Sequence, residues 1–212
     1  MCSIKLLDMH IGIAGNIGSG KTTLTQMLAD HYGWVPKFES VTYNPYLEDY
    51  YKDISRWSYN LETYFLACRF KDLLEIAKSD KVIVQDRTLY EGVHIFVRNN
   101  YEMGNLSERD YNTYMQLFEL ISSVAGNPDL LIYLRCSVPH LVDHIHKRGR
   151  DYEQSMSLEY LSGLNDKYEE WIASYEGRLL VVDADNLDFK DNPQDFARLT
   201  DRIDAELFGL FK

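Results

Sequence analysis

The chain has little cysteine, no long apolar run and a deficit of positive charge, and each shortage excludes a class of protein. Its three cysteines (Cys2, Cys68 and Cys136) are scattered and odd in number. This argues against a disulfide-stabilised secreted domain and predicts reduced thiols in the cytoplasm. No segment approaches the ~20 apolar residues of a membrane-spanning helix, so we expect no membrane partner. A formal net charge of −11 repels polyanions, so we expect no nucleic-acid partner.

The rest of the composition suits one folded domain over residues 1–212. Hydrophobic residues make up 45% of the chain, and no repeats or linker-like stretches interrupt it. Short apolar runs alternate with longer amphipathic segments, which is typical of a parallel sheet crossed by helices. We therefore predict an α/β protein with three layers, α/β/α, around a five-stranded parallel sheet. Strands are expected at 10–14, 34–38, 82–85, 130–134 and 179–182, and helices at 22–31, 55–78, 89–101, 107–125, 137–147, 157–175 and 193–208.

A glycine-rich motif lies between the first expected strand and the first expected helix. Residues 15–22 read GNIGSGKT and match the phosphate-loop pattern G-x-x-x-x-G-K-[ST], with its strand–loop–helix context. The apolar N-terminal stretch leads straight into this loop, so we do not expect a signal peptide. The alternative is a glycine-rich turn with a surface lysine. The motif predicts a P-loop kinase fold, with ATP bound by Gly15, Asn16, Ile17, Gly18, Ser19, Gly20, Lys21, Thr22 and Thr23 and with Thr22 as a ligand of Mg²⁺.

Charged residues follow the second and third expected strands. Ligands of open α/β sheets bind beyond the carboxyl ends of the strands, so Glu39 is placed to face the phosphate loop and accept a proton from a hydroxyl. Asp86 is placed to support Mg²⁺, and Arg87 to hold a phosphate or Glu39. The alternatives are a solvated loop glutamate and a structural Asp–Arg pair at a strand end.

A short basic run, KRGR at residues 147–150, lies between two expected helices in an otherwise acidic chain. A glycine between arginines suits a mobile lid, at about residues 148–155, that brings Arg148 and Arg150 over the transferring phosphates. The alternative is a solvated charged surface. Together with Lys21 and Arg87, this run supplies the local positive charge that a nucleotide needs.

These motifs together resemble the deoxyribonucleoside kinases, which include the deoxycytidine, deoxyguanosine and mitochondrial-type thymidine kinases and their bacterial relatives. GNIGSGKTT, Glu39, QDRTLYE and KRGRDYEQ occur in the order and spacing of that family, and RWSYNLETYF at 56–65 is similar to its substrate helix. The resemblance covers nearly the whole chain. It implies a homodimeric enzyme that uses ATP and Mg²⁺ to phosphorylate the 5′-hydroxyl of a deoxyribonucleoside in deoxynucleotide salvage.

The resemblance also implies roles for single residues. Glu39 would deprotonate the 5′-hydroxyl, Arg87 would orient that group and contact phosphate, and Asp86 would support Mg²⁺. Arg148 and Arg150 would belong to the lid. The substrate contacts that it implies are Tyr51 and Glu153 to the sugar 3′-hydroxyl, and Trp57 and Phe96 against the base; otherwise such aromatic residues are ordinary core.

Three positions depart from the family pattern. Glu62 stands where the family has a base-reading glutamine, Gly92 where an aspartate is frequent, and His144 where the lid helix has an arginine. The first two concern base specificity, and the third concerns the efficiency of the lid. The residues for phosphoryl transfer are all present.

The base preference follows from one helical face. Glu62, Phe65 (or Leu66) and Arg69 share that face in the expected helix 55–78. An ionised glutamate offers only acceptors, whereas guanine presents two adjacent donors and Arg69 would donate to its O6 or N7. Gly92 would leave room beside the base. This favours a purine, with guanine slightly ahead of adenine; in the alternative, Glu62 forms a salt bridge with Arg69 and accepts from the adenine amino group.

Other functions fit parts of the pattern less well. A nucleoside monophosphate kinase on the same fold needs a second arginine set for the acceptor phosphate. A non-catalytic kinase-like assembly subunit has no need of Lys21, Glu39 and Arg87 together. His140 and His144 are four residues apart, but spacing supplies no third ligand, so surface histidines are a better interpretation than a zinc site.

Overall fold

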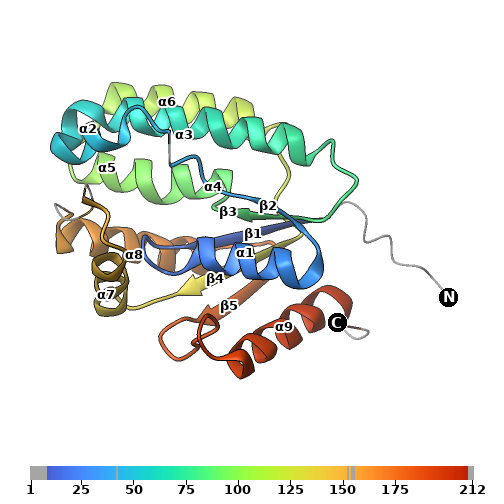
Figure 1. The fold of residues 1–212 in the computed structure, drawn as a ribbon. Helices are drawn as coiled ribbons and strands as arrows, with labels where there is room; N and C mark the ends of the chain where they lie inside the picture. Colours follow the sequence, from blue (N-terminus) through green and yellow to red (C-terminus); the bar gives the residue numbers. More distant parts are fainter. Residues whose placement is uncertain (1–8, 42, 152, 154–155, 210–212) are drawn as a thin grey trace.

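The computed structural model describes residues 9–41, 43–151, 153 and 156–209. Within them, five parallel strands form one sheet in the order β2-β3-β1-β4-β5 (Figure 1). In the register of the central strand, Ile11 lies opposite Val84 on one side and Leu130 on the other. The predicted sheet is confirmed, with strands β1 (His10–Gly15), β2 (Val35–Lys37), β3 (Ile83–Asp86), β4 (Leu130–Arg135) and β5 (Leu179–Asp183).

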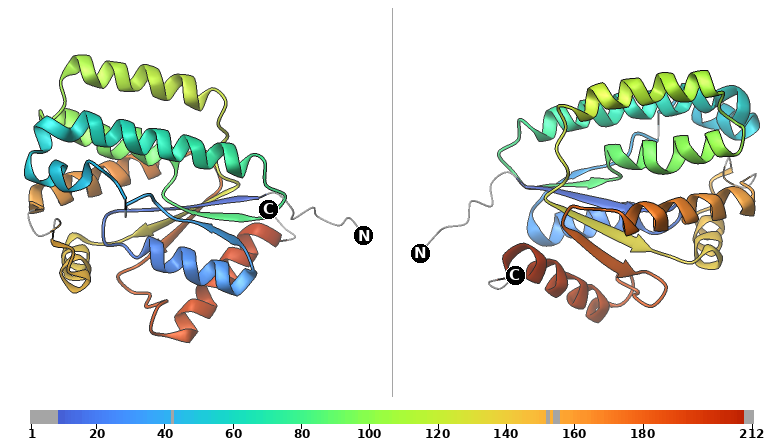
Figure 2. Two further views of the ribbon diagram at one scale, coloured as in Figure 1. Left: turned by 45° about the horizontal axis from the view of Figure 1, so that its top comes forward. Right: turned by 180° about the vertical axis from the view of Figure 1, so that it is seen from behind.

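Helices cover both faces of the sheet, as the alternating pattern predicts (Figure 2). In the described part of the chain, none of them is long and apolar enough to cross a membrane. Their bounds are α1 (Lys21–Tyr32), α2 (Leu47–Lys52), α3 (Ile54–Ile76), α4 (Leu89–Glu91), the π-helix η1 (Gly92–Val97), α5 (Arg98–Glu102), α6 (Glu108–Ser122), α7 (Val138–Arg148), α8 (Leu158–Ala173) and α9 (Pro193–Phe208).

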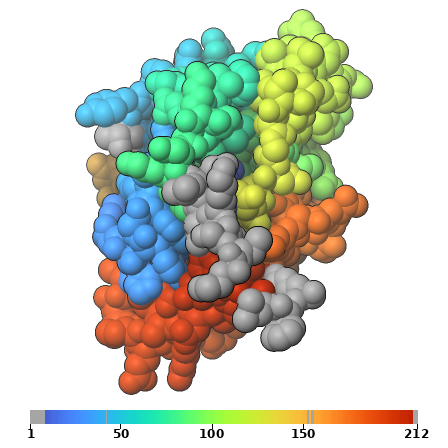
Figure 3. Space-filling model, turned by 90° about the vertical axis from the view of Figure 1, so that its right-hand side faces the viewer, coloured from blue at the N-terminus to red at the C-terminus, as the bar shows by residue number. Residues whose placement is uncertain are grey.

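Helices α1 and α9 pack on one face of the sheet. Leu24 and Leu28 from α1 and Leu199 and Ile203 from α9 are buried in one cluster with the side chains of that face. Viewed from the side where the strands begin, the red C-terminal segment forms the lower part of the molecule and the blue α1 lies above it (Figure 3). The period of apolar residues in both helices follows from this one-sided burial.

The opposite face carries α8 and the segment from α4 to α5, with α3 and α6 outside that segment (Figure 1). The helix predicted at 89–101 is present as the unbroken run of α4, η1 and α5, but its middle part widens into a π-helix at Gly92–Val97. A π turn contains an extra residue, and such turns are frequent at functional sites. Here Ile95 is buried in the core while the next residue, Phe96, lines a cavity. Helix α2 has no counterpart in the sequence prediction.

Because all five strands are parallel, their carboxyl ends lie on one side of the sheet, beside α2 and α7 (Figure 1). The loops that follow β1, β2 and β3 therefore converge there. This is the edge at which open α/β sheets bind their ligands.

Candidate active site

The phosphate loop connects β1 to α1. Gly15, Gly18 and Gly20 have φ angles of 153°, 87° and 92°, which residues other than glycine rarely adopt. A Cβ atom on Gly18 would also lie 2.9 Å from the Leu141 carbonyl oxygen. Helix α1 begins directly after Gly20, so its unpaired N–H groups face the loop. A helix N-terminus of this kind binds anions.

Lys21 is buried within this loop. Its Nζ donates a hydrogen bond to the Asn16 carbonyl oxygen at 2.8 Å. Burial, followed by the charge of Arg87, outweighs the attraction of nearby carboxylates and lowers the pKa of Lys21 to about 8. A polyphosphate beside Nζ would favour the charged ammonium. The ammonium is therefore held in the position that a phosphate oxygen requires.

Thr22, at the start of α1, meets Asp86 at the end of β3. The Thr22 hydroxyl donates to Asp86 Oδ2 at 2.5 Å, while the buried Oδ1 of Asp86 has no hydrogen-bond partner in the described structure. Burial raises the pKa of this carboxyl. Hydroxyl and carboxylate oxygens are the ligands that Mg²⁺ prefers, and an orphaned buried oxygen needs a partner. The two residues therefore fit the predicted magnesium site.

Glu39, in the loop after β2, lies between two arginines. Arg69 Nη2 donates to Glu39 Oε1 at 2.6 Å, and Arg87 Nε donates to Oε2 at 3.1 Å. Burial raises the pKa of Glu39, but the charges of Arg87, Arg69 and Lys21 outweigh burial and bring it to about 2. Glu39 is therefore a carboxylate at ordinary pH, which is the form that accepts a proton.

Arg87 is held in an unusual backbone conformation. Its φ of 70° is the only positive value among the described residues other than glycine. Such a conformation costs about 1–3 kcal/mol and persists where surrounding contacts enforce it. Arg87 Nη1 donates to the Tyr168 hydroxyl at 2.6 Å and to Glu91 Oε1 at 3.2 Å, and Tyr168 in turn donates to Glu91 Oε1 at 2.7 Å.

Glu91 and Tyr168 were not among the predicted site residues. A signal for Glu91 was present, because Thr88-Leu89-Tyr90-Glu91 has the capping-box spacing S/T-x-x-E. Glu91 Oε2 indeed accepts from the Thr88 N–H at 2.7 Å. Tyr168 lies 81 residues from Arg87, and no local pattern marks it. Both residues fix the direction of the Arg87 guanidinium.

A cavity of about 380 Å³ joins the phosphate loop to an apolar pocket. Phe96 and Phe65 line the pocket, with the Arg87 guanidinium 4.6 Å from the first ring and the Arg69 guanidinium 5.1 Å from the second. The fold thus brings these distant predicted residues to one cavity: Ile17, Gly18, Lys21, Thr22, Glu39, Tyr51, Glu62, Phe65, Arg69, Asp86, Arg87, Phe96, Arg148, Arg150 and Glu153.

In the base pocket, the salt bridge between Glu62 and Arg69 that was given as the alternative does not form, since Arg69 Nη2 pairs with Glu39 Oε1. The expectation of free space beside Gly92 is wrong. Gly92 leaves no open room, since a Cβ atom there would lie 2.9 Å from both Arg69 Nη1 and the Tyr114 hydroxyl. Gly92 instead makes space for the Arg69 guanidinium.

The described residues of the lid form ion pairs with one another. Arg148 Nη2 donates to both carboxylate oxygens of Glu153, at 2.7 and 2.6 Å, and Arg150 Nη1 lies 3.4 Å from one of them. Glu153 is buried although its partners are half-exposed. Residues 152, 154 and 155 of the predicted lid lie outside the described residues. Glu153 thus holds the two lid arginines at the cavity.

Trp57 lies on α3, one turn before the cavity-lining Leu61, and is not itself among the residues that line the cavity. The Arg56 guanidinium lies 4.4 Å from its ring centre, and the Tyr46 ring lies 6.0 Å away. Its contact with a base therefore stays a prediction.

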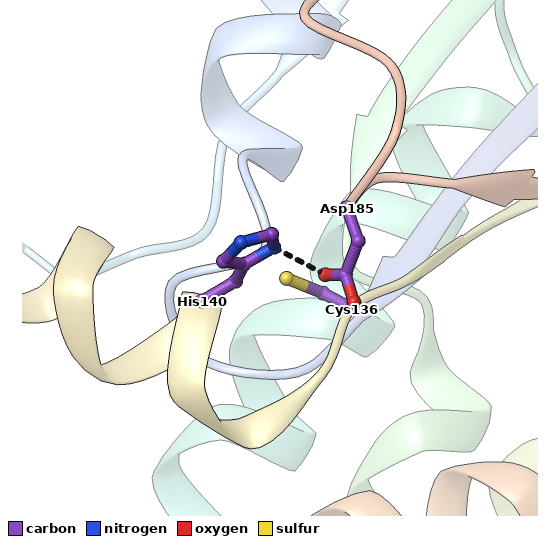
Figure 4. A group of neighbouring side chains, drawn as sticks. All are labelled: Cys136, His140 and Asp185. Carbon is purple, nitrogen blue, oxygen red and sulfur yellow. Dashed lines mark ion pairs between the residues drawn. The ribbon is translucent and has the colours of Figure 1, made fainter.

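The fold, unlike the spacing, brings a cysteine and a carboxylate to His140 (Figure 4). The potential ligand atoms of Cys136, His140 and Asp185 lie within 4.8 Å of one another. Asp185 Oδ1 lies 2.8 Å from His140 Nδ1 and accepts from the Ser137 N–H at 2.9 Å. Burial, followed by the hydrogen bond to Asp185, raises the pKa of the Cys136 thiol to about 12. Asp185 thus contacts both the Ser137 N–H at the N-cap of α7 and His140, and we interpret the group as hydrogen bonds that anchor the start of α7.

Sequence comparison places the chain among nucleoside-phosphorylating enzymes. A profile of the deoxynucleoside kinase family matches residues 11–208. The deoxyadenosine/deoxycytidine kinase of Bacillus subtilis is 36% identical over 91% of this chain and 90% of its own length. The deoxyadenosine kinase of Dictyostelium discoideum is 38% identical over 92% of this chain and 79% of its own length. The deoxyguanosine kinase of B. subtilis is 34% identical over 91% of this chain and 95% of its own length.

Structural comparison agrees. Deoxyadenosine kinase from M. mycoides, solved with the products dCMP and a flexible dCDP, has a TM-score of 0.83 and is 32% identical over 93% of this chain and 100% of that chain. The same kinase with bound dATP has a TM-score of 0.81, and the match covers 92% of this chain and 99% of that chain. The predicted P-loop kinase fold and the predicted ATP-dependent deoxyribonucleoside kinase are thereby confirmed, and the chain belongs to the deoxynucleoside kinase family.

Proposed function

We propose that the chain transfers the γ-phosphoryl group of ATP to the 5′-hydroxyl of a purine deoxyribonucleoside, deoxyguanosine or deoxyadenosine. The observation that carries the proposal is the place of Glu39. Its carboxylate lies between Arg87 and Arg69 where the phosphate-loop end of the cavity meets the apolar pocket. A nucleoside with its base in the pocket therefore presents its 5′-hydroxyl to Glu39.

The chain's own residues position the reactants and stabilise charge. Phosphoryl transfer passes through a loose transition state, for which positioning and charge stabilisation supply most of the catalysis. Lys21 and Arg87 supply positive charge from below the phosphates, and Arg148 and Arg150 supply it from the lid. Glu39 accepts the proton of the attacking hydroxyl. Mg²⁺ held by Thr22 and Asp86 would neutralise charge on the β- and γ-phosphates.

The purine preference rests on the pocket and on the relatives. Glu62 and Arg69 line the pocket with acceptors and donors suited to purine edges. Relatives that cover most of this chain are named for deoxyadenosine, in one case together with deoxycytidine, and for deoxyguanosine. Glu39 also disfavours a nucleoside monophosphate as acceptor, because its carboxylate would repel the acceptor phosphate.

The proposal includes a homodimer in the cytoplasm. Leu117, Leu120 and Val124 lie along α6 and its end with 37%, 71% and 73% of their surface exposed. A row of exposed apolar side chains is typical of a protein–protein interface, and a second copy of the chain would bury it. A monomeric mass in solution would contradict the dimer. The cytoplasmic location rests on the unpaired thiols of Cys68 and Cys136.

A panel of deoxyribonucleosides, incubated with ATP and Mg²⁺, tests the activity. We expect 5′-monophosphate from deoxyadenosine or deoxyguanosine in preference to thymidine and deoxycytidine. Product from deoxynucleoside monophosphates, with none from any nucleoside, would contradict the proposal.

His144→Arg should strengthen the use of ATP. His144 Nδ1 lies 2.8 Å from the Gly18 carbonyl oxygen, which places this side chain against the phosphate loop. An arginine there keeps a donor for that oxygen and adds a permanent charge and further donors for phosphate. We expect the apparent KM for ATP to fall by about three- to tenfold, as one added charge contact of ~1 kcal/mol implies.

His146→Arg is the matched control for this change. His146 is exposed near the end of the same helix, so an arginine there adds the same charge at a different position. An equal effect of both substitutions, or no effect of His144→Arg, would show that His144 does not act on the nucleotide.

A further inference from the structure

The carboxyl group of Glu62 is buried with little compensation. Only 2% of the residue is exposed, yet the side chain lines the cavity. Its Oε1 accepts one long hydrogen bond from Asn100 Nδ2, at 3.5 Å, and its Oε2 has no partner in the described structure. Arg69, the cation of the same helix whose charge acts on Glu62, is paired with Glu39 instead. A buried carboxylate without a counter-ion is costly.

The groups around Glu62 come from six other segments besides α3. Two are arginines whose attraction stabilises the ionised form, and Glu39 opposes it by repulsion. The others are neutral hydroxyls and an amide. Tyr50 donates to Asn100 Oδ1 and lies 2.8 Å from the Tyr160 hydroxyl, so that amide and both tyrosines are already engaged. The charged and titratable groups that face Glu62 are Arg69, Glu39, Arg87, Tyr50, Tyr114 and Tyr160.

Burial outweighs the attraction of both arginines and raises the pKa of Glu62 to about 8. Near neutral pH the free side chain is therefore mostly a carboxylic acid, and the carboxylate dominates above that pKa. This corrects the assumption, made from the sequence, that Glu62 is ionised. The pocket exists in two protonation forms within the ordinary working range of an enzyme.

The two forms match different purine edges. A neutral carboxylic acid offers one donor and one acceptor, which fit N1 and the 6-amino group of adenine. A carboxylate offers acceptors only, which fit N1–H and the 2-amino group of guanine. Adenine cannot use the carboxylate in the same way, because its N1 lone pair would face a negative oxygen. Guanine would pair with the neutral acid only through O6 and N1–H, which leaves its 2-amino group without an acceptor, so each mismatch leaves a buried polar atom unsatisfied.

Arg69 adds to the distinction. Its Nε and Nη1 are buried and have no hydrogen-bond partner in the described structure, so this guanidinium beside the pocket has unused hydrogen-bond donors. Guanine presents O6 and N7 on one edge, whereas adenine presents N7 beside a donor. The guanidinium therefore favours guanine wherever Glu62 accepts the two guanine donors.

We propose that Glu62 determines purine preference through its own protonation, selecting deoxyadenosine as the neutral acid and deoxyguanosine as the carboxylate. The inference rests on the proposed kinase activity and refines its substrate. Glutamine at this position has one fixed donor–acceptor pair, whereas glutamate has two. Glutamate in place of the family's glutamine thus allows the same pocket to bind both purines.

The test is the ratio of kcat/KM for deoxyguanosine to kcat/KM for deoxyadenosine, measured from about pH 6 to about pH 8.5 around the Glu62 pKa. The ratio cancels the titration of Lys21 and every other group that acts on both substrates alike. We expect it to rise about tenfold or more across this range in the wild type. A ratio that does not change with pH would overturn the proposal.

Two variants sharpen the result. Glu62→Gln cannot titrate, so its ratio should stay constant within about twofold over the same range. Glu75→Gln removes a carboxylate from the exposed side of the same helix, where 48% of the side chain is exposed, and should keep the rising ratio. A rising ratio in Glu62→Gln would assign the effect to another group.

Calorimetry of the wild type keeps the proposal testable even if Glu62→Gln does not fold. Near pH 7, deoxyguanosine binding should release close to one proton into the buffer, and deoxyadenosine binding should release almost none. Titrations in two buffers of different ionisation enthalpy measure this number. Equal proton release for both nucleosides would contradict the proposal. Failure of the proposed function is a different result: no nucleoside would be phosphorylated at any pH.

Discussion

Glu39→Gln is expected to lower kcat by about 10²–10⁴-fold while the KM for the nucleoside changes by only a few-fold. The amide keeps the shape of the side chain and one acceptor for the arginines, but it cannot take the proton of the 5′-hydroxyl. Arg87 keeps its hydrogen bonds to Glu91 and Tyr168. Steady-state kinetics with the nucleoside varied at saturating ATP separates the two parameters.

Glu48→Gln, an exposed change on α2, is the control and should leave both parameters unchanged. The pH profile gives a second check. Because the pKa of Glu39 is about 2, the carboxylate persists down to that pH and kcat/KM should show no acid limb from Glu39 between about pH 5 and 7. Turnover near that of the wild type in Glu39→Gln would remove Glu39 from the role of base.

Lys21→Ala is expected to lower kcat at saturating ATP by about 10²–10³-fold, the scale seen when one preorganised donor to a developing charge is lost. Lys21 Nζ is held by the Asn16 carbonyl oxygen within the phosphate loop, so its charge needs no rearrangement when the γ-phosphoryl group moves. Its effect should fall on kcat more than on ATP affinity, because the transition state carries the redistributed charge.

Lys21→Met keeps most of the side-chain length and should show the same loss, which separates the charge from packing of the loop. Lys147→Ala removes an exposed positive charge beside the lid and should cost at most a few-fold. Unchanged turnover of Lys21→Ala at saturating ATP would contradict the assignment of the phosphate loop.

Local pattern alone determined the architecture and the phosphate-binding end of the site. The alternation of short apolar runs with amphipathic segments predicts a sheet buried on both faces, and the five strands confirm it. Gly15 to Thr22 specify the loop, because positive φ angles and close backbone approach require glycine at fixed spacing. The sequence also placed Glu39, Asp86 and Arg87 at strand ends, where parallel topology brings them together without further information.

Only the tertiary structure decided which charges pair and which stay alone. Arg69 shares a helical face with Glu62, yet it binds Glu39 from another segment. Tyr168 fixes Arg87 from α8, and Cys136 and Asp185 reach His140 from the ends of two strands. The charge state of Glu62 depends on burial by several segments that are distant in sequence. Periodicity reports which face of an element is buried, but the free energy of an ionised group depends on every neighbour in space, and folding alone assembles those neighbours.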